Sequence, residues 1–282
     1  MMKLVFRTVL LLMTVTLMIM AQEDKKESGW TYTMTGNLNL SQIALDNWVE
    51  GGDNAWSWQL NIKGKATREE TTFKWVSSGN ANFGKSKIGS DQSRKAVDEI
   101  QLESVYTRKL GLPVNPYAAL TARTQFAKGY EYSDTSRMAI SAFMDPGYFT
   151  QSVGMGYQFK DSFSTRLGAS MKETITSDFP VPYADDPETA EIETSRIEFG
   201  AESVTDLNLS FSENLLFSSQ LSLFSDFSAL NKIDVDWDSQ LTATINKYVN
   251  VNLAFRLLYD RNLHVKRQIK EALAIGLTYN FF

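Results

Sequence analysis

The stretch 233–260, IDVDWDSQLTATINKYVNVNLAFRLLYD, decides the fold. Apolar and polar residues alternate on both sides of the connector 246–248, with Ser239 as the one polar residue on the apolar face of the first arm. A period of two residues is the pattern of paired strands, so the stretch predicts a β-hairpin. Each arm has eleven to thirteen residues, which matches the roughly 9 to 11 residues that a tilted strand needs to cross a bilayer. The hairpin therefore predicts a transmembrane β-barrel.

The rest of the chain contains ten further runs with the same period, which gives twelve strands in all. The eighth strand is the least regular, because residues 203–206 interrupt its alternation. That interruption is consistent either with a β-bulge or with a strand that reaches beyond the membrane. The ten runs are 30–41, 55–66, 71–83, 97–109, 117–127, 148–159, 163–175, 192–212, 215–227 and 270–282.

The connectors differ in length according to their order, which supports a barrel independently of the strand pattern. Outer-membrane barrels have short periplasmic turns and long outer loops, and an even number of strands places both termini in the periplasm. A soluble β-sandwich gives no reason for this sorting. The short connectors are 67–70, 110–116, 160–162, 213–214 and 246–248. The mostly longer ones are 42–54, 84–96, 128–147, 176–191, 228–232 and 261–269.

The N-terminus has the pattern of a secretory signal peptide. Lys3 and Arg7 precede an apolar run over 9–20, and Ala21 offers a cleavage site before a polar segment. A membrane anchor is the alternative, but about twelve apolar residues are too few to span a bilayer. We therefore expect a signal peptide over 1–21, a polar leader over 22–29 and an outer-membrane barrel over 30–282, in a Gram-negative bacterium.

Composition excludes several classes of partner and site. The chain has no cysteine, so it can form neither disulfides nor thiolate metal sites. Removal of Lys3 and Arg7 with the signal peptide leaves 26 basic against 33 acidic residues, a net charge of about −7. This sign disfavours a nucleic-acid partner. The expected partners are outer-membrane lipids and a possible further protein of the cell envelope.

The chain ends in Leu-Thr-Tyr-Asn-Phe-Phe, which resembles the aromatic C-terminal signal that hands outer-membrane barrels to their insertion machinery. The alternating phase of Leu277, Tyr279 and Phe281 makes Phe281 the lipid-facing aromatic, rather than the terminal Phe282. The resemblance implies the insertion machinery as a partner, and simple packing of the aromatic end is the alternative.

The segment 40–52, LSQIALDNWVEGG, carries a family resemblance. Asn47, Trp48, Gly51 and Gly52 are similar to the "Asn-Trp, small, small, Gly-Gly" signature of DUF3078, a Bacteroidota outer-membrane family of unknown function. The Asn-Lys-Tyr turn and the strand after it are likewise similar to that family. The resemblance implies an outer-membrane barrel and implies no activity.

The polar faces of the strands carry charges of both signs. Lys or Arg on the lipid side near the membrane midplane costs roughly 2 to 4 kcal/mol, so these groups must face the lumen. We expect Lys63, Arg166 and Arg256 to pair with Glu103, Glu198 and Glu202 and to narrow the bore. The predicted lumen-lining residues are Lys63, Lys65, Glu103, Arg123, Arg166, Lys172, Arg196, Glu198, Glu202, Asp236, Asp238 and Arg256.

Two strands have unusually small inward residues. They are Thr150, Ser152, Gly154 and Gly156 on the sixth strand, and Ala272, Ala274, Gly276 and Thr278 on the twelfth. Small residues permit tight curvature of a barrel wall, and they also leave room for an inserted loop or ligand. The best candidate for insertion is the loop 43–52, because Trp48 and two glycines are unusual in a solvated loop.

The sequence offers little support for catalysis or metal binding. His264 is the only histidine; it lies in a basic loop with no Gly-x-Ser-x-Gly motif in the chain and no orienting carboxylate beside it. Asp234, Asp236 and Asp238 share one strand face and could hold calcium only with help from a loop. The alternative is that the three carboxylates form a solvated acidic edge that faces the lumen and holds no ion. We expect no catalytic residue, no metal and no cofactor.

The function predicted from the sequence is a narrow channel for small polar solutes. The first alternative is a non-conducting barrel subunit of a larger envelope assembly. The second is an outer-membrane hydrolase, which would need a serine within hydrogen-bond reach of His264.

Overall fold

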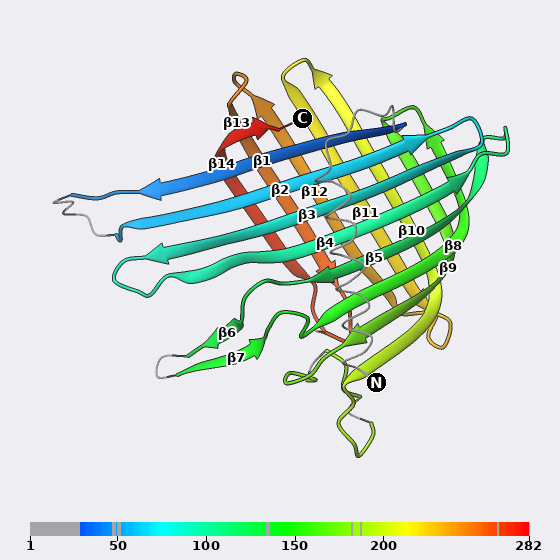
Figure 1. Cartoon of the computed structure of the whole chain (residues 1–282). Helices are drawn as coiled ribbons and strands as arrows, with labels where there is room; N and C mark the ends of the chain where they lie inside the picture. Colours follow the sequence, from blue (N-terminus) through cyan, green and yellow to red (C-terminus); the bar gives the residue numbers. More distant parts are fainter. Residues whose placement is uncertain are drawn as a thin grey trace. The chain divides into compact units, whose positions relative to one another are not determined.

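In the computed structural model, twelve antiparallel strands form a closed barrel (Figure 1). The structure describes residues 29–46, 49, 52–133, 136–181, 183–186, 188–263 and 265–281. Those from Thr31 onward belong to one compact unit. Within the described ranges no helix is long and apolar enough to cross a membrane. The all-β, twelve-stranded closed barrel predicted from the sequence is thus confirmed; the signal peptide and residues 22–28 of the leader lie outside the described residues.

Each barrel strand pairs with its neighbours in sequence order, and β1 closes the ring on β14. The strands are β1 (Trp30–Ile43), β2 (Ala55–Glu69), β3 (Phe73–Ile88), β4 (Arg94–Arg108), β5 (Val114–Thr124), β8 (Gly147–Phe159), β9 (Phe163–Ile175), β10 (Ser195–Ser212), β11 (Leu215–Asp226), β12 (Ile233–Thr244), β13 (Val249–Tyr259) and β14 (Gln268–Asn280). The loop between β5 and β8 contains a separate two-stranded hairpin, β6 (Gly129–Tyr132) and β7 (Arg137–Ser141), which the sequence pattern did not predict.

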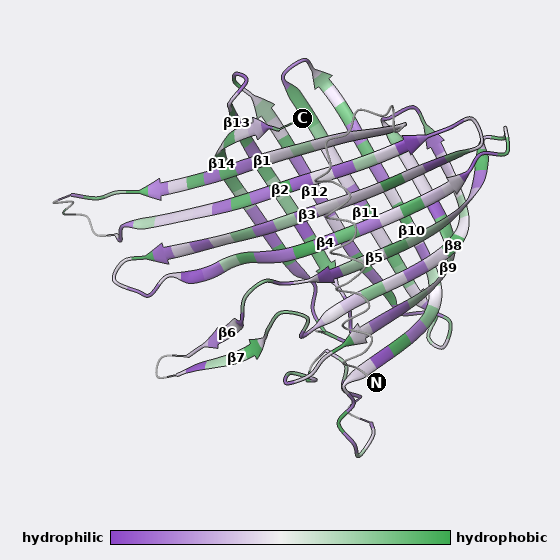
Figure 2. Cartoon of the chain, viewed as in Figure 1, coloured by the Kyte–Doolittle hydropathy of each residue, from purple (hydrophilic) through white to green (hydrophobic). Residues whose placement is uncertain are grey.

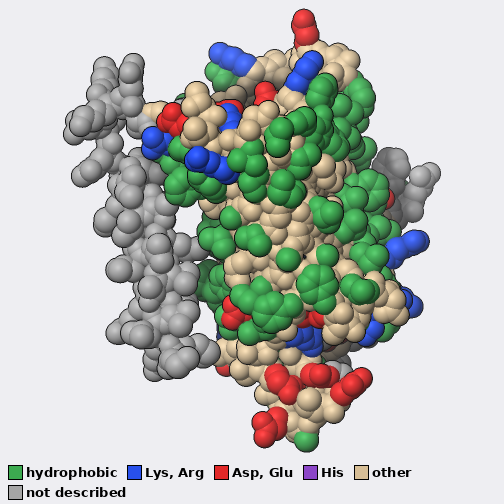
Figure 3. Space-filling view, turned by 90° about the vertical axis from the view of Figure 1, so that its right-hand side faces the viewer, with side chains coloured by type: hydrophobic (Ala, Val, Ile, Leu, Met, Phe, Trp, Pro, Cys, Tyr) green, Lys and Arg blue, Asp and Glu red, His purple; other side chains and the backbone are tan. Residues whose placement is uncertain are grey.

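The barrel is apolar outside and polar inside. Hydropathy alternates along the strands (Figure 2), and large outward side chains such as Leu167 and Leu273 are 63% and 68% exposed. Buried positions are instead occupied largely by polar groups, among them Asn252 and Glu198. Figure 3 shows apolar side chains spread over the wall between the two ends of the barrel, with backbone and polar atoms between them, and most Asp and Glu side chains toward the two ends. This distribution is that of a transmembrane β-barrel.

The C-terminal strand follows the predicted phase. Leu277, Tyr279 and Phe281 are 47%, 59% and 51% exposed, so all three face outward. The rings of Tyr279 and Phe281 contact each other edge to face, with centroids 5.0 Å apart. Phe282 lies outside the described residues.

Several predictions about strand ends were wrong, among them β5, which runs from Val114 to Thr124 rather than over 117–127. β3 continues to Ile88 and β4 begins at Arg94, so most of the predicted loop 84–96 is strand. The register shifts between Gly84 and Lys85, and beyond this bulge polar residues occupy both faces. The hydrophobic pattern therefore ends before the backbone pairing does. In addition, β10 begins at Ser195 rather than at residue 192.

β10 is continuous through residues 203–206, so of the two alternatives for this interruption the β-bulge is wrong, and the 18-residue length of β10 fits a strand that reaches beyond the membrane. Ser203 pairs with Leu223 on one side and Leu167 on the other, and the register does not shift there. Val204 is buried on the inner face, while Thr205 hydrogen bonds Thr165 at 2.9 Å. At these positions an apolar residue faces inward and a polar residue faces outward, while the side chains still alternate between the two faces of the strand.

The small inward residues serve curvature and close packing. Gly154 and Gly168 lie opposite each other on β8 and β9, and a Cβ on either would overlap backbone atoms of the other strand. On β14, a Cβ on Gly276 would overlap the Asn37 and Asn250 side chains. The space beside these glycines is therefore already filled by protein atoms. Trp48 of the candidate inserting loop lies outside the described residues.

Candidate functional site in the barrel lumen

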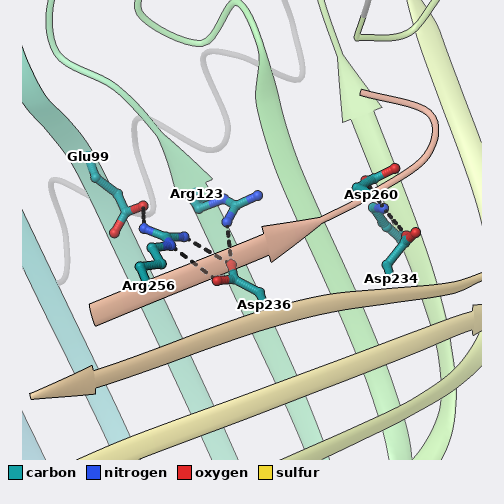
Figure 4. A network of polar contacts seen from close by, with 7 residues as sticks. Glu99, Arg123, Asp234, Asp236, Arg256 and Asp260 are labelled. Atoms are coloured by element: carbon teal, nitrogen blue, oxygen red, sulfur yellow. Dashed lines mark hydrogen bonds and ion pairs between the residues drawn. The ribbon is translucent and has the colours of Figure 1, made fainter. Parts of the chain in front are cut away.

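An ion-pair bridge crosses the lumen near its long-loop end (Figure 4). We define this bridge as Arg123, Asp236, Arg256 and Glu99. Arg123 Nη1 donates to Asp236 Oδ2 at 2.7 Å, and Arg256 donates to both Asp236 oxygens at 3.1 and 2.9 Å. Arg256 Nη1 also donates to Glu99 Oε2 at 2.5 Å. Because β4 and β5 are separated from β12 and β13 around the ring, these contacts join opposite walls.

A second cluster, the Lys172 cluster, lies at the same end of the lumen. Lys172 Nζ is 2.9 Å from Asp234, 3.0 Å from Asp260 and 3.6 Å from Glu198. Asn262 Nδ2 donates to Glu198 Oε1 at 2.9 Å. One ammonium therefore faces three carboxylates, which leaves this part of the wall negative. A lysine already occupies the centre that a cation would need.

A third contact lies on the inner side of the ion-pair bridge. Arg166 of β9 pairs with Glu103 of β4, again across the lumen, and its guanidinium lies 5.9 Å from the ring centroid of Tyr117. Glu202 Oε2 is buried without a hydrogen-bond partner in the described part of the chain. Arg166 thus pairs with Glu103 while Glu202 makes no ion pair among the described residues, so this region too has more carboxylates than cations in contact.

The structure brings some predicted lumen residues together and leaves others apart. Arg166 meets Glu103 as expected, but Arg256 pairs with Asp236 and Glu99, and Glu198 pairs with Lys172. The expected pairing was therefore wrong for Arg256 and Glu198, and neither Lys63 nor Glu202 forms an ion pair with another described residue. Parity identifies the face of a strand, whereas the tilt and stagger of the strands decide which wall residue lies opposite.

The other predicted residues have weaker contacts. Arg196 Nη2 donates to the carbonyl oxygen of Asp185 at 2.5 Å. Lys63, Lys65 and Asp238 are exposed and form no ion pair within 4.0 Å of another described residue. Asn47, Trp48, Gly51 and His264 lie outside the described residues, and Gly52 has a φ of +116°.

Sequence reasoning missed Glu99 and Asp260. Glu99 lies two residues before Gln101 and four before Glu103, on the same strand face, and extension of that alternation by one step finds it. Asp260 likewise follows Arg256 and Leu258 at intervals of two. Glu99 lies inside β4, whereas Asp260 directly follows the last residue of β13.

Two cavities meet at the ion-pair bridge. The outer vestibule has a volume of about 530 Å³ and is bounded partly by loop residues, including Gln125, Pro146 and Tyr183. The inner cavity has about 140 Å³ and is lined by Glu103, Arg166 and Glu202 among others. Arg123, Tyr148 and Leu258 line both cavities. The bridge therefore stands between an outer and an inner water-accessible space.

Hydrogen bonds fix the loops that wall the outer vestibule. The buried Asp145 carboxylate accepts from Ser177 N at 3.0 Å and from Asp178 N at 2.7 Å. These bonds tie the loop after β9 to the loop after β5. Tyr183 projects from the loop after β9, and the pKa of its hydroxyl is raised above the ordinary tyrosine value, because burial outweighs the lowering effect of a hydrogen bond to Ser141.

Nothing in the described ranges offers a metal site. No group of three or more His, Asp or Glu side chains there is arranged to hold a metal ion. Two of the three aspartates of β12 are already paired with cationic side chains. Asp234 pairs with Lys172, and Asp236 pairs with Arg123 and Arg256.

Residues 40–130 match the model of DUF3078, a protein family of unknown function. This match confirms the family resemblance seen in the sequence. The DUF3078 match covers β2 to β5, and therefore Glu99, Glu103 and Arg123. The partners of these residues on β9, β12 and β13 lie outside the matched range. No curated protein matches the chain.

Several solved β-barrels are similar in structure at low sequence identity. The COG4313 outer membrane channel from Pseudomonas putida F1 is 9% identical, with 92% of this chain and 99% of that chain covered and a TM-score of 0.40. The NanC porin is 9% identical, with 88% and 98% covered and a TM-score of 0.40. The translocator domain of autotransporter NalP from Neisseria meningitidis is 7% identical, with 91% and 90% covered and a TM-score of 0.39.

Proposed function

We propose that this chain is an outer-membrane β-barrel of a Gram-negative bacterium and acts as a narrow channel for small polar solutes. The observation that carries the proposal is the ion-pair bridge between two cavities. A barrel lined by polar groups on both sides of a charged constriction has the parts of a narrow pore for small polar solutes. The N-terminal signal-peptide pattern and the apolar outer wall support the outer-membrane location.

The bridge is hydrated rather than sealed. Its side chains Arg123, Asp236 and Arg256 retain 24%, 28% and 25% of their exposure, so water reaches them. A constriction of this kind passes small solutes by local rearrangement of partly solvated ion pairs, which are weaker than fully buried ones. Mixed charge at the constriction predicts weak discrimination between small anions and cations.

Conductance in planar bilayers tests the channel. The purified barrel should give small, stable ion steps, and Arg123→Ala should enlarge them because it removes one link between opposite walls. Lys247→Ala, in the turn between β12 and β13, is the matched control and should leave the steps unchanged. A barrel that is folded but silent, both as wild type and as Arg123→Ala, would refute the channel.

One observation favours the alternative of a non-conducting barrel subunit. The ion-pair bridge and the pair of Arg166 with Glu103 both span the lumen, and such spans can close a bore. In that case the barrel should stay silent in bilayers and should co-purify with another envelope protein in fixed stoichiometry.

A further inference from the structure

The outer vestibule has the dimensions of a ligand site. Its volume of about 530 Å³ falls within the roughly 300 to 1,000 Å³ typical of pockets for small molecules. Its wall combines charged groups with the apolar surfaces of Tyr148, Tyr183, Leu258 and Ile269. A cavity with a few polar groups set among aromatic and aliphatic side chains both orients a ligand and buries its body.

The cationic groups of the vestibule have unused hydrogen-bond donors. Among the described residues, Arg123 donates only to Asp236, through Nη1, although a guanidinium carries five N–H groups. Figure 4 shows the other end of this guanidinium directed away from Asp236. Among the described residues, Lys270 Nζ donates only to the carbonyl oxygen of Ala96, at 3.0 Å. Its ammonium group forms no ion pair within 4.0 Å of a carboxylate of another described residue.

The acidic groups of the vestibule are largely engaged. The Asp98 side chain is almost fully buried, and its two oxygens accept from the Phe126 and Ala127 amides at 2.7 and 2.9 Å. Lys95 Nζ donates to the same carboxylate at 3.0 Å. Glu99 is held by Arg256. The groups of the cavity that keep unused hydrogen-bonding capacity are therefore the cations, although the chain as a whole is acidic.

The wall is also held in place before any ligand arrives. Lys95 fixes the loop after β5 through Gln125 and Ala127, at 3.1 and 3.0 Å. Arg123 is positioned by Asp236 on one side and lies 4.9 Å from the ring centroid of Tyr148 on the other. Such preorganisation lowers the entropic cost of binding.

We propose that the outer vestibule binds a small organic carboxylate with an aromatic or aliphatic body. The carboxylate pairs with the unused N–H groups of Arg123 and with the Lys270 ammonium. The body lies against Tyr148, Tyr183 and Ile269. The proposal deepens the proposed channel function by naming a solute class for its outer mouth, and it can be measured on a barrel that does not conduct.

Calorimetric titration of the full barrel in detergent tests the site, with three probes that share one ring. Benzoate carries the negative charge, benzyl alcohol is neutral and benzylamine is positive. We expect saturable binding of benzoate that weakens with added salt, and roughly tenfold weaker binding of the other two probes, because charge-assisted hydrogen bonds contribute the larger part of recognition.

Variants separate the two cations from the fold. Lys270→Gln, on an exposed position, should weaken benzoate binding roughly tenfold, and Arg123→Gln should weaken it at least as much. Lys247→Gln lies in a distant turn and should bind as wild type does. The folded fraction of each variant is read from its heat-shifted gel mobility.

Several outcomes would overturn the proposal. They are no binding of benzoate to the folded wild type, equal affinity for benzoate and benzyl alcohol, preference for benzylamine, or unchanged binding by both Lys270→Gln and Arg123→Gln. If the barrel binds benzoate but does not conduct in bilayers, the proposed channel function is refuted and the proposed carboxylate site is supported. If it conducts but does not bind benzoate, the carboxylate site is refuted and the channel function is supported.

Discussion

At the scale of single residues, the outer wall satisfies its polar groups with one recurring arrangement. Trp237 Nε1 donates to Ser219 Oγ on the neighbouring strand at 2.9 Å, and Ser219 and Ser239 hydrogen bond at 2.9 Å. On β3 and β4, Trp75 donates to Ser104, which also contacts Ser77, with the same distances. Both sites are Trp-x-Ser on one strand opposite Ser on the next. Hydroxyls and indole N–H groups facing lipid need such partners, because water is absent there.

This arrangement predicts a measurable coupling. Ser219→Ala should destabilise the barrel by about 1 to 2 kcal/mol, because the Trp237 indole loses its acceptor. Trp237→Phe removes the donor, so Ser219→Ala should cost less in the Trp237→Phe background, with a coupling of at least about 0.5 kcal/mol. Urea midpoints from gel mobility of the folded barrel measure all four proteins. Strictly additive effects would show that the indole finds another partner.

At the scale of elements, two facing glycines set the curvature of the wall. Gly168 approaches the backbone of β8 so closely that a Cβ would also lie 2.7 Å from the Tyr117 hydroxyl. The inward small residues of β8 and β9 therefore mark a bend rather than an empty space. By contrast, Gly64 of β2 has no atom within 4 Å of its hypothetical Cβ.

The contrast between Gly168 and Gly64 supplies a prediction with an internal control. Gly168→Ala should destabilise the barrel by about 1 to 3 kcal/mol, because the new methyl forces the β8–β9 backbone apart. Gly64→Ala should be neutral or slightly stabilising, because alanine lowers the entropy of the unfolded chain and meets nothing in the barrel. Refolding yield into detergent and urea midpoints measure both. If both substitutions change the stability of the barrel equally, the close approach of β8 and β9 does not explain why glycine is needed at position 168.

At the scale of the whole molecule, connector lengths set the orientation. The described turns 70–72, 160–162 and 213–214 lie at one end of the barrel, and the described parts of the loops after β5 and after β9 lie at the other. The ion-pair bridge and the Lys172 cluster both lie nearer the end that carries the long loops. If the long loops face outward, a solute meets the outer vestibule before the ion-pair bridge.

Labelling tests this orientation, since the natural chain has no cysteine. A single cysteine at Ser90 or Asn262 should react with an impermeant thiol reagent on intact cells, because both lie in connectors at the long-loop end. A cysteine at Ser162 should react only after the outer membrane is opened. Reaction at Ser162 on intact cells would invert the barrel.

The sequence by itself determined the architecture. A period of two residues over the length of a bilayer-spanning strand, repeated twelve times with alternating connector lengths, leaves a closed barrel as the arrangement that satisfies every backbone group. The same period assigned Arg123, Arg166, Asp236 and Arg256 to the polar face. Local chemistry suffices for this because neighbouring side chains point to opposite faces in every strand.

Only the tertiary structure decided which residues meet. Arg256 contacts Asp236 and Glu99 rather than Glu198, and Lys172 gathers Asp234 and Asp260. Partners across a lumen depend on strand tilt, register and stagger summed around the ring, and a periodic pattern contains none of these quantities. Strand ends were missed for a related reason: β3 and β4 keep pairing through backbone hydrogen bonds after their hydrophobic faces have ended, because the backbone pairs whatever side chains it carries.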